Sequence, residues 1–98
     1  MSASWAGRVA LAEADALPGH YYVTVRREDG AYFLALGPFT QYRPGKDAHA
    51  RALGLVRRVR RHVNEIGANQ FNDLLFGTAR RPITDPLIPG KLNKELMP

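Results

Sequence analysis

The chain has 98 residues, of which 45% are hydrophobic and 23% are charged, and its formal net charge is +5 at pH 7. This length and composition predict a single domain with an ordinary buried core. The lack of cysteine excludes disulfides, thiolate zinc sites and cysteine nucleophiles. No apolar run reaches the roughly 18 residues of a membrane-spanning helix, and the first residues do not resemble a secretory signal. We therefore expect a cytoplasmic protein without a membrane partner. The basic charge favours anionic partners.

Composition divides the predicted domain into three parts. We expect an alanine-rich N-terminal segment over residues 1–19, a folded core over 20–80, and a proline-rich strap over 81–98. In the first part, Ser4 is a candidate N-cap for a short helix in which Trp5 packs against the core. An extended conformation of the same segment stays open as an alternative.

Residues 20–36 predict a β-hairpin. Two runs rich in Tyr, Val, Phe and Leu flank Asp29-Gly30, a dipeptide typical of two-residue hairpin turns. Such a turn places Val25 opposite Leu34, and residues paired in this way share one face of the sheet. The apolar face then consists of Tyr21, Val23, Val25, Leu34 and Leu36.

The second face of the hairpin mixes aromatic and basic side chains. It is predicted to carry Tyr22, Thr24, Arg26, Phe33 and Ala35. Proteins that bind single-stranded nucleic acid stack bases on such rings while cations follow the backbone. Tyr22, Arg26 and Phe33 therefore form a candidate secondary binding surface. Alternatively, the N-terminal segment or a second copy of the chain covers this face.

Residues 47–67 predict a long amphipathic helix. Asp47 is the expected N-cap, and Gly67 is the expected left-handed residue at the helix end. Apolar residues recur at steps of three or four, namely Ala48, Ala52, Leu55, Val59, Val63 and Ile66. The opposite side is basic and carries Arg51, Arg57, Arg58, Arg60 and Arg61. These arginines are either a solvated surface or a binding patch, because guanidinium groups hold phosphates and carboxylates bidentately.

A third strand is predicted over residues 74–80, because a hairpin needs a further neighbour for stability. The alternative is a short helix capped by Asn69. The proline-rich strap excludes a long regular element, and we expect Leu87 and Ile88 to anchor it. The predicted fold is α+β, with a small three-stranded, mainly antiparallel sheet in ββαβ order and one long helix packed on one face.

The sequence lacks recognisable catalytic, cofactor and metal motifs. Ser2 and Ser4 are the only serines, and no glycine-rich nucleotide-binding loop occurs. His62 and Glu65 lie one helical turn apart, but no motif places a third metal ligand beside them. We therefore expect a protein that is not an enzyme and that has no cofactor and no metal.

Four short motifs carry a resemblance to a known group of proteins. They are Tyr21-Tyr22-Val23-Thr24, Gly37-Pro38-Phe39, Phe76-Gly77-Thr78-Ala79-Arg80 and Pro89-Gly90-Lys91-Leu92-Asn93. Together they resemble short bacteriophage and prophage proteins of unassigned function. The resemblance implies a mobile-element origin and a cytoplasmic location in a bacterial host, and it implies no particular activity.

Two functions fit these features. The first is a phage-type accessory protein that binds nucleic acid, without catalysis, through the arginines of the helix. The alternative is a phage-encoded inhibitor of a host defence or regulatory protein, comparable to an anti-CRISPR, that uses the same arginines against an acidic or nucleic-acid-binding surface. A homodimer that pairs the Tyr22 and Phe33 faces is a third alternative.

Overall fold

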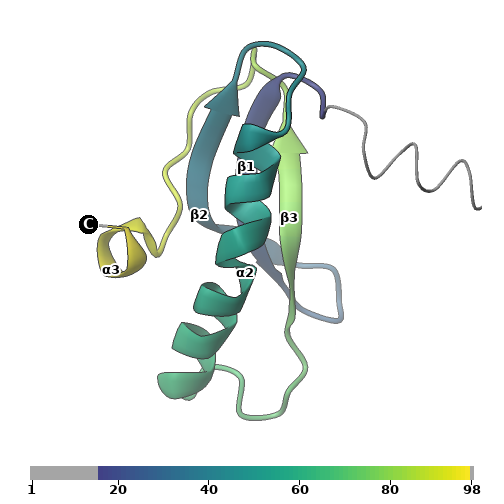
Figure 1. Cartoon of the computed structure of the whole chain (residues 1–98). Helices are drawn as coiled ribbons and strands as arrows, with labels where there is room; N and C mark the ends of the chain where they lie inside the picture. Colours follow the sequence, from purple (N-terminus) through teal and green to yellow (C-terminus); the bar gives the residue numbers. More distant parts are fainter. Residues whose placement is uncertain (1–15, 98) are drawn as a thin grey trace, which may run out of the picture.

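The computed structural model describes residues 16–97 of the chain (Figure 1). The elements are β1 (Gly19–Arg26), β2 (Tyr32–Gln41), α2 (Asp47–Glu65), β3 (Leu75–Arg81) and α3 (Asn93–Leu96). The predicted Ser4 cap and the packing of Trp5 lie outside the described residues.

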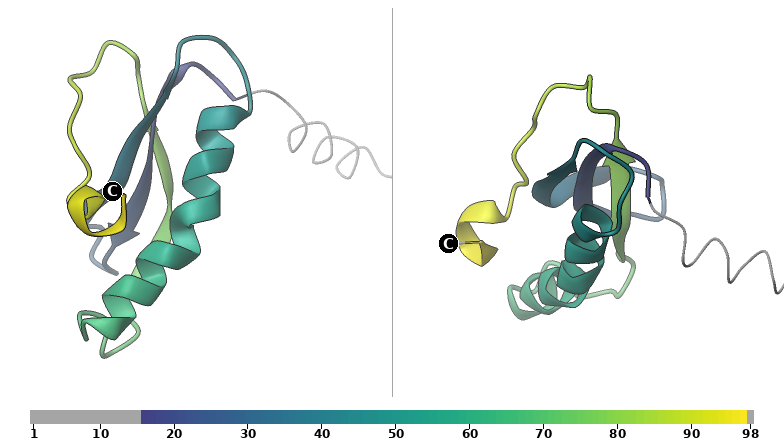
Figure 2. Two further views of the ribbon diagram at one scale, coloured as in Figure 1. Left: turned by 60° about the vertical axis from the view of Figure 1, so that its left-hand side comes forward. Right: turned by 45° about the horizontal axis from the view of Figure 1, so that its top comes forward.

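The three strands form one antiparallel sheet in the order β2-β1-β3, and α2 lies across one face of it (Figures 1 and 2). The predicted α+β fold with ββαβ connectivity is thereby confirmed. Because β1 is central, all but its last residue, Arg26, are buried. The third strand forms as expected, and the alternative helix capped by Asn69 is wrong. Instead, the Asn69 side chain accepts a hydrogen bond from the Leu74 backbone at 3.2 Å.

Helix α2 forms because its apolar residues line one side of a 3.6-residue repeat. Four of the predicted residues are buried, namely Ala48, Ala52, Val59 and Val63. Leu55 and Val56 pack against them while half-buried. Full burial of a valine side chain contributes about 1.5–3 kcal/mol, so Val59 and Val63 hold the helix on the sheet. Ile66 does not join them, because it lies beyond the helix end and is 61% exposed.

The two ends of α2 differ in how well they were predicted. Gly67 has φ of +77°, which confirms its left-handed conformation. Asp47 is not the N-cap; Lys46 occupies that position, without a side-chain cap. The Gln41 side chain supplies the missing acceptor, since its Oε1 accepts a hydrogen bond from the Ala48 backbone at 3.2 Å.

The hairpin turn between β1 and β2 is one residue longer than predicted. The Arg27 and Ala31 backbones still pair, and the Asp29 carboxylate accepts a hydrogen bond from Ala31 N. Consequently Val25 pairs with Phe33 rather than with Leu34. An irregularity farther along β2 then restores the predicted register, and Val23 pairs with Leu36.

This register exchanges two side chains between the faces of the sheet. Phe33 shares the face of Val25 and packs against the core beneath α2. Leu34 pairs with Thr24 on the opposite face, where it is buried. The predicted positions of Tyr21, Val23, Val25 and Leu36 on the helix side are confirmed.

Residues 82–92 run from the side of the sheet away from α2 around the edge of β2 and lead to α3 (Figure 2). The predicted anchors are wrong, because Leu87 and Ile88 are 62% and 42% exposed. The segment is held instead by what we call the C-terminal clamp. It comprises backbone hydrogen bonds from Gly90 to Gly37, from Lys91 to Leu34 and from Leu92 to Ala35. The Asn93 side chain also accepts a hydrogen bond from the Gly37 N–H and donates one to the Gly37 carbonyl.

Candidate functional site

The five arginines predicted as a binding patch are all exposed on α2, and we call this surface the arginine face. Its members are Arg51, Arg57, Arg58, Arg60 and Arg61. At about 100° per residue, Arg57 and Arg61 point almost directly away from the buried Val59. Arg60 lies on one flank, and Arg51 and Arg58 lie on the other. The sheet fixes which side of α2 is buried, so it also fixes the outward direction of the arginines.

None of these arginines forms an ion pair within residues 16–97. The salt bridge found in that range joins Arg27 to Asp29 at 3.5 Å, at the hairpin turn. Glu65 lies one helical turn after Arg61, but no ion pair joins the two side chains. Like charges on adjacent turns of a helix repel each other by a few tenths of a kcal/mol. The arginine face therefore gathers positive charge that the described part of the protein does not neutralise.

The C-terminal half of the face is slightly concave. A shallow hollow of about 400 Å³ is lined by Arg57, Arg60, Arg61, Asn64 and Glu65. Three arginines and Glu65 thus border one depression, beside a side-chain amide that can both donate and accept hydrogen bonds. Such an arrangement can hold one phosphate or carboxylate between several donors.

Arg51 differs from the other four arginines. Its guanidinium carbon lies 5.0 Å from the centre of the Phe39 ring, within the range of a cation–π interaction. Phe39 is buried beneath the start of α2. Arg51 therefore stabilises the fold in addition to presenting positive charge.

The predicted secondary surface of Tyr22, Arg26 and Phe33 does not exist as one surface. Tyr22 is fully buried, and its hydroxyl accepts a hydrogen bond from the Ile88 backbone at 3.3 Å. Phe33 lies on the helix side, with Lys91 Nζ 5.7 Å from its ring centre. Only Arg26 is exposed on the expected face. The longer hairpin turn places Phe33 on the helix side of the sheet, and the proline-rich C-terminal strap covers Tyr22.

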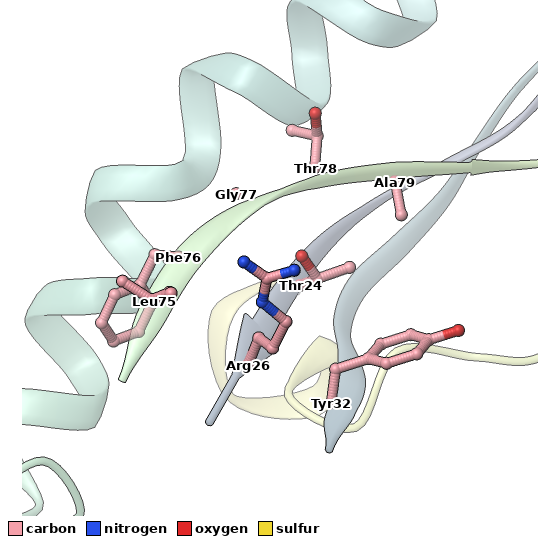
Figure 3. Close-up of a pocket in the computed structure, with 8 residues that line it drawn as sticks. All are labelled: Thr24, Arg26, Tyr32, Leu75, Phe76, Gly77, Thr78 and Ala79. Atoms are coloured by element: carbon pink, nitrogen blue, oxygen red, sulfur yellow. The ribbon is translucent and has the colours of Figure 1, made fainter. Parts of the chain in front are cut away.

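A different aromatic residue takes the place of Phe33 on that face. Tyr32 is 54% exposed and pairs with Arg26, which pairs on its other side with Leu75. These residues border a cavity of about 330 Å³ that we call the sheet-face slot (Figure 3). It is lined by Thr24, Arg26, Tyr32, Leu75, Phe76, Gly77, Thr78 and Ala79. Sequence reasoning missed Tyr32 because a two-residue turn places it on the helix side.

An apolar groove opens at the other side of the hairpin end, between the sheet and the end of α2. Its volume is about 430 Å³, and Phe33, Ile66 and Leu74 contribute to its largely apolar lining. Arg27 and Lys91 also line it. The exposed Phe71 follows the same helix end along the chain.

His20 and His49 make contacts that stabilise the fold. His20 is buried and hydrogen-bonded to the Thr40 hydroxyl and to the Ile83 carbonyl. His49 packs beside the Tyr21 ring at a centroid distance of 5.3 Å. Within residues 16–97, no group of three or more His, Asp or Glu side chains is placed to hold a metal ion. In the same range, no helix is both long and apolar enough to cross a lipid bilayer.

Comparison with known proteins adds no further constraint: no family model, curated protein or solved structure matches the chain.

Proposed function

We propose that the protein is a phage-type accessory protein that binds nucleic acid, without catalysis, through the arginine face. The observation that supports this proposal is the display of five exposed guanidinium groups with no carboxylate partner within residues 16–97. Arg51 and Arg61 are separated by ten residues, which is about 15 Å along a helix. A surface of this length, with arginines on both flanks of the helix, can contact several phosphates of a bound strand or duplex.

The expected contact is with the phosphate backbone rather than with bases. Guanidinium groups bind phosphate oxygens bidentately, and such contacts supply affinity without sequence information. Asn64 lines the hollow beside the arginines, and its side-chain amide could contact a base edge. The proposal therefore predicts binding with weak sequence preference and strong salt dependence.

A salt series tests the electrostatic origin of binding. If about five phosphates are neutralised, the affinity for a duplex or single strand falls by roughly two to three decades between 50 and 200 mM salt. Fluorescence anisotropy with labelled oligonucleotides measures this slope. A dissociation constant that does not change with salt contradicts the proposal.

A charge-reversed pair tests the location. Arg57→Glu/Arg61→Glu removes two contacts, so the affinity should fall at least about tenfold and the salt slope should decrease by about two. Arg43→Glu/Lys94→Glu is the matched control, because both residues are exposed and lie outside α2. This double variant changes the net charge by the same amount as Arg57→Glu/Arg61→Glu. Equal losses in the two variants would mean that net charge, and not the arginine face, attracts the oligonucleotide.

The apolar groove favours one second candidate, a phage-encoded inhibitor that docks on an acidic surface of a host protein. Protein interfaces combine arginines with apolar anchors in pockets, and the groove lies at the same end of α2 as the arginine hollow. Phosphate binding does not require this groove.

The two candidates respond differently to Ile66→Asp. This exposed residue lines the groove but is not part of the arginine face. A nucleic-acid binder should keep its oligonucleotide affinity within about twofold at physiological salt, since no arginine is removed and one added exposed charge is largely screened. If the protein is an inhibitor, the unmodified chain should pull down a host protein in stoichiometric amount even after nuclease treatment. The Ile66→Asp variant should no longer pull down that protein. Retention of that protein by the variant argues against docking in the groove.

A further inference from the structure

The sheet-face slot lies on the opposite side of the sheet from α2. Binding of nucleic acid through the arginine face does not use it. Arg26 and Tyr32 border it together with β3 (Figure 3). We propose that the slot binds a nucleotide unit, stacking its base on Tyr32 and pairing its phosphate with Arg26. This site is separate from the arginine face and does not depend on it.

The shape of the slot fits a planar ring. Its wall on β3 carries only small groups at Gly77 and Ala79, while the Leu75 side chain borders the end beside Arg26. A Cβ added at Gly77 would meet no atom within 4 Å, so the space above this residue is open. Thr78 turns to the other face, where its hydroxyl lies 3.4 Å from His49 Nε2. The volume of about 330 Å³ falls within the usual size of small-molecule sites.

Tyr32 provides the stacking surface. It is 54% exposed, and its hydroxyl accepts a hydrogen bond from the Arg81 guanidinium at 3.3 Å. This bond restrains the ring without covering it. Base–aromatic stacking is tolerant of sequence because every base has a π face.

Arg26 provides the charge. It is exposed and forms no ion pair within residues 16–97, whereas the neighbouring Arg27 pairs with Asp29. No acidic residue lines the slot. A phosphate beside Arg26 would therefore meet a guanidinium that can bind it bidentately and no opposing carboxylate. A ring and a phosphate together define a nucleotide unit, either free or within a single strand.

The test uses adenosine 5′-monophosphate, adenosine and inorganic phosphate as separate probes of the full chain. In ¹H–¹⁵N NMR titrations we expect adenosine 5′-monophosphate to shift the amide signals of Thr24, Gly77 and Ala79 and to bind at least about tenfold tighter than either fragment. If inorganic phosphate bound as tightly as adenosine 5′-monophosphate, Tyr32 would have no stacking role. If only amide signals of α2 shifted, the nucleotide would not bind in the slot.

Variants then separate the ring from the charge. Tyr32→Ala should weaken binding at least about fivefold, while Tyr32→Phe, which keeps the ring, should stay within about threefold of the unmodified protein. Arg26→Gln should bring the affinity for the monophosphate down to that for adenosine, and Arg27→Gln is the matched control. Equal effects of the two arginine variants, or equal effects of the two tyrosine variants, contradict the proposal.

Two further measurements fix the relation to nucleic-acid binding. The variant Arg57→Glu/Arg61→Glu should still bind adenosine 5′-monophosphate at the slot, so failure of the proposed function and failure of this inference are distinguishable. A short single-stranded oligoadenylate should bind the slot of this variant more tightly than the monophosphate if the natural ligand is a strand, and equally if it is a free nucleotide. Loss of monophosphate binding in the variant would refute an independent site.

Discussion

The polar groups of the C-terminal clamp are hydrogen-bonded within the protein, whereas those of the arginine face have no acidic partner in the described part of the chain. In the clamp, the Asn93 side chain binds both the backbone N–H and the carbonyl of Gly37, at 3.1 and 2.6 Å. On the arginine face, guanidinium groups point away from the protein without an acidic partner within residues 16–97. A buried polar group must be paired to be tolerated, whereas an exposed charge stays unpaired at little cost. The first region therefore holds the fold together, and the second is available to a partner.

The largest effect that separates the two regions is expected from Gly90→Ala. A Cβ at Gly90 would lie 2.6 Å from the Ala35 carbonyl oxygen and 2.7 Å from Leu36 Cα, so backbone must move. We expect a loss of about 1–3 kcal/mol in the free energy of unfolding. Urea denaturation measures the loss.

Gly54→Ala is the control for this substitution. Gly54 lies within α2, and an added Cβ would meet nothing within 4 Å. Because alanine favours a helix, this variant should be more stable by roughly 0.5–1 kcal/mol. If both glycine variants change stability in the same direction, the close packing of the clamp is not what restricts position 90.

A smaller effect should distinguish Arg51 from the rest of its face. Arg51→Gln removes the cation–π contact with Phe39 and should lower the free energy of unfolding by about 0.5–1 kcal/mol. Arg58→Gln has the same chemistry on an exposed neighbour and should stay within about 0.5 kcal/mol of the unmodified protein. Thermal unfolding of the pair at one ionic strength compares them, and indistinguishable midpoints would show that the Phe39 contact contributes nothing.

The smallest change is expected from Arg57→Gln/Arg61→Gln, and it should have the opposite sign. Removal of two like charges one helical turn apart should raise stability by about 0.2–0.5 kcal/mol at low salt. Added salt should shrink this gain, because exposed charges are screened. Urea denaturation at two ionic strengths measures it while binding of nucleic acid falls. A loss of stability would mean that these arginines serve the fold.

Local patterns predicted much of the fold. The repeat of Val59 and Val63 placed α2 on the sheet, and Gly67 marked its end, because both signals act within a few residues. The Asp29-Gly30 dipeptide located the hairpin but not its turn length. Positive φ at Gly30 suits both two-residue and three-residue turns, so the dipeptide could not decide which face Phe33 would occupy.

The contacts that sequence reasoning missed join residues of different structural elements. Gln41 binds the Ala48 backbone at the start of α2, and Asn93 binds Gly37 across 56 residues. No local periodicity signals such pairs. The candidate site followed the same rule: the arginine face depends on one helix and was found, whereas the sheet-face slot depends on the register of three strands. Only the strand register places Tyr32 beside Arg26.

The position of the C-terminal clamp also decides where another strand could join the sheet. The clamp occupies backbone carbonyls of β2, so that edge of the sheet is already capped. Within residues 16–97, no strand pairs with the outer edge of β3. Edge strands are templates for intermolecular β-sheet extension, and cationic residues discourage it. We therefore expect any strand that joins this sheet to add at the outer edge of β3 and not at β2.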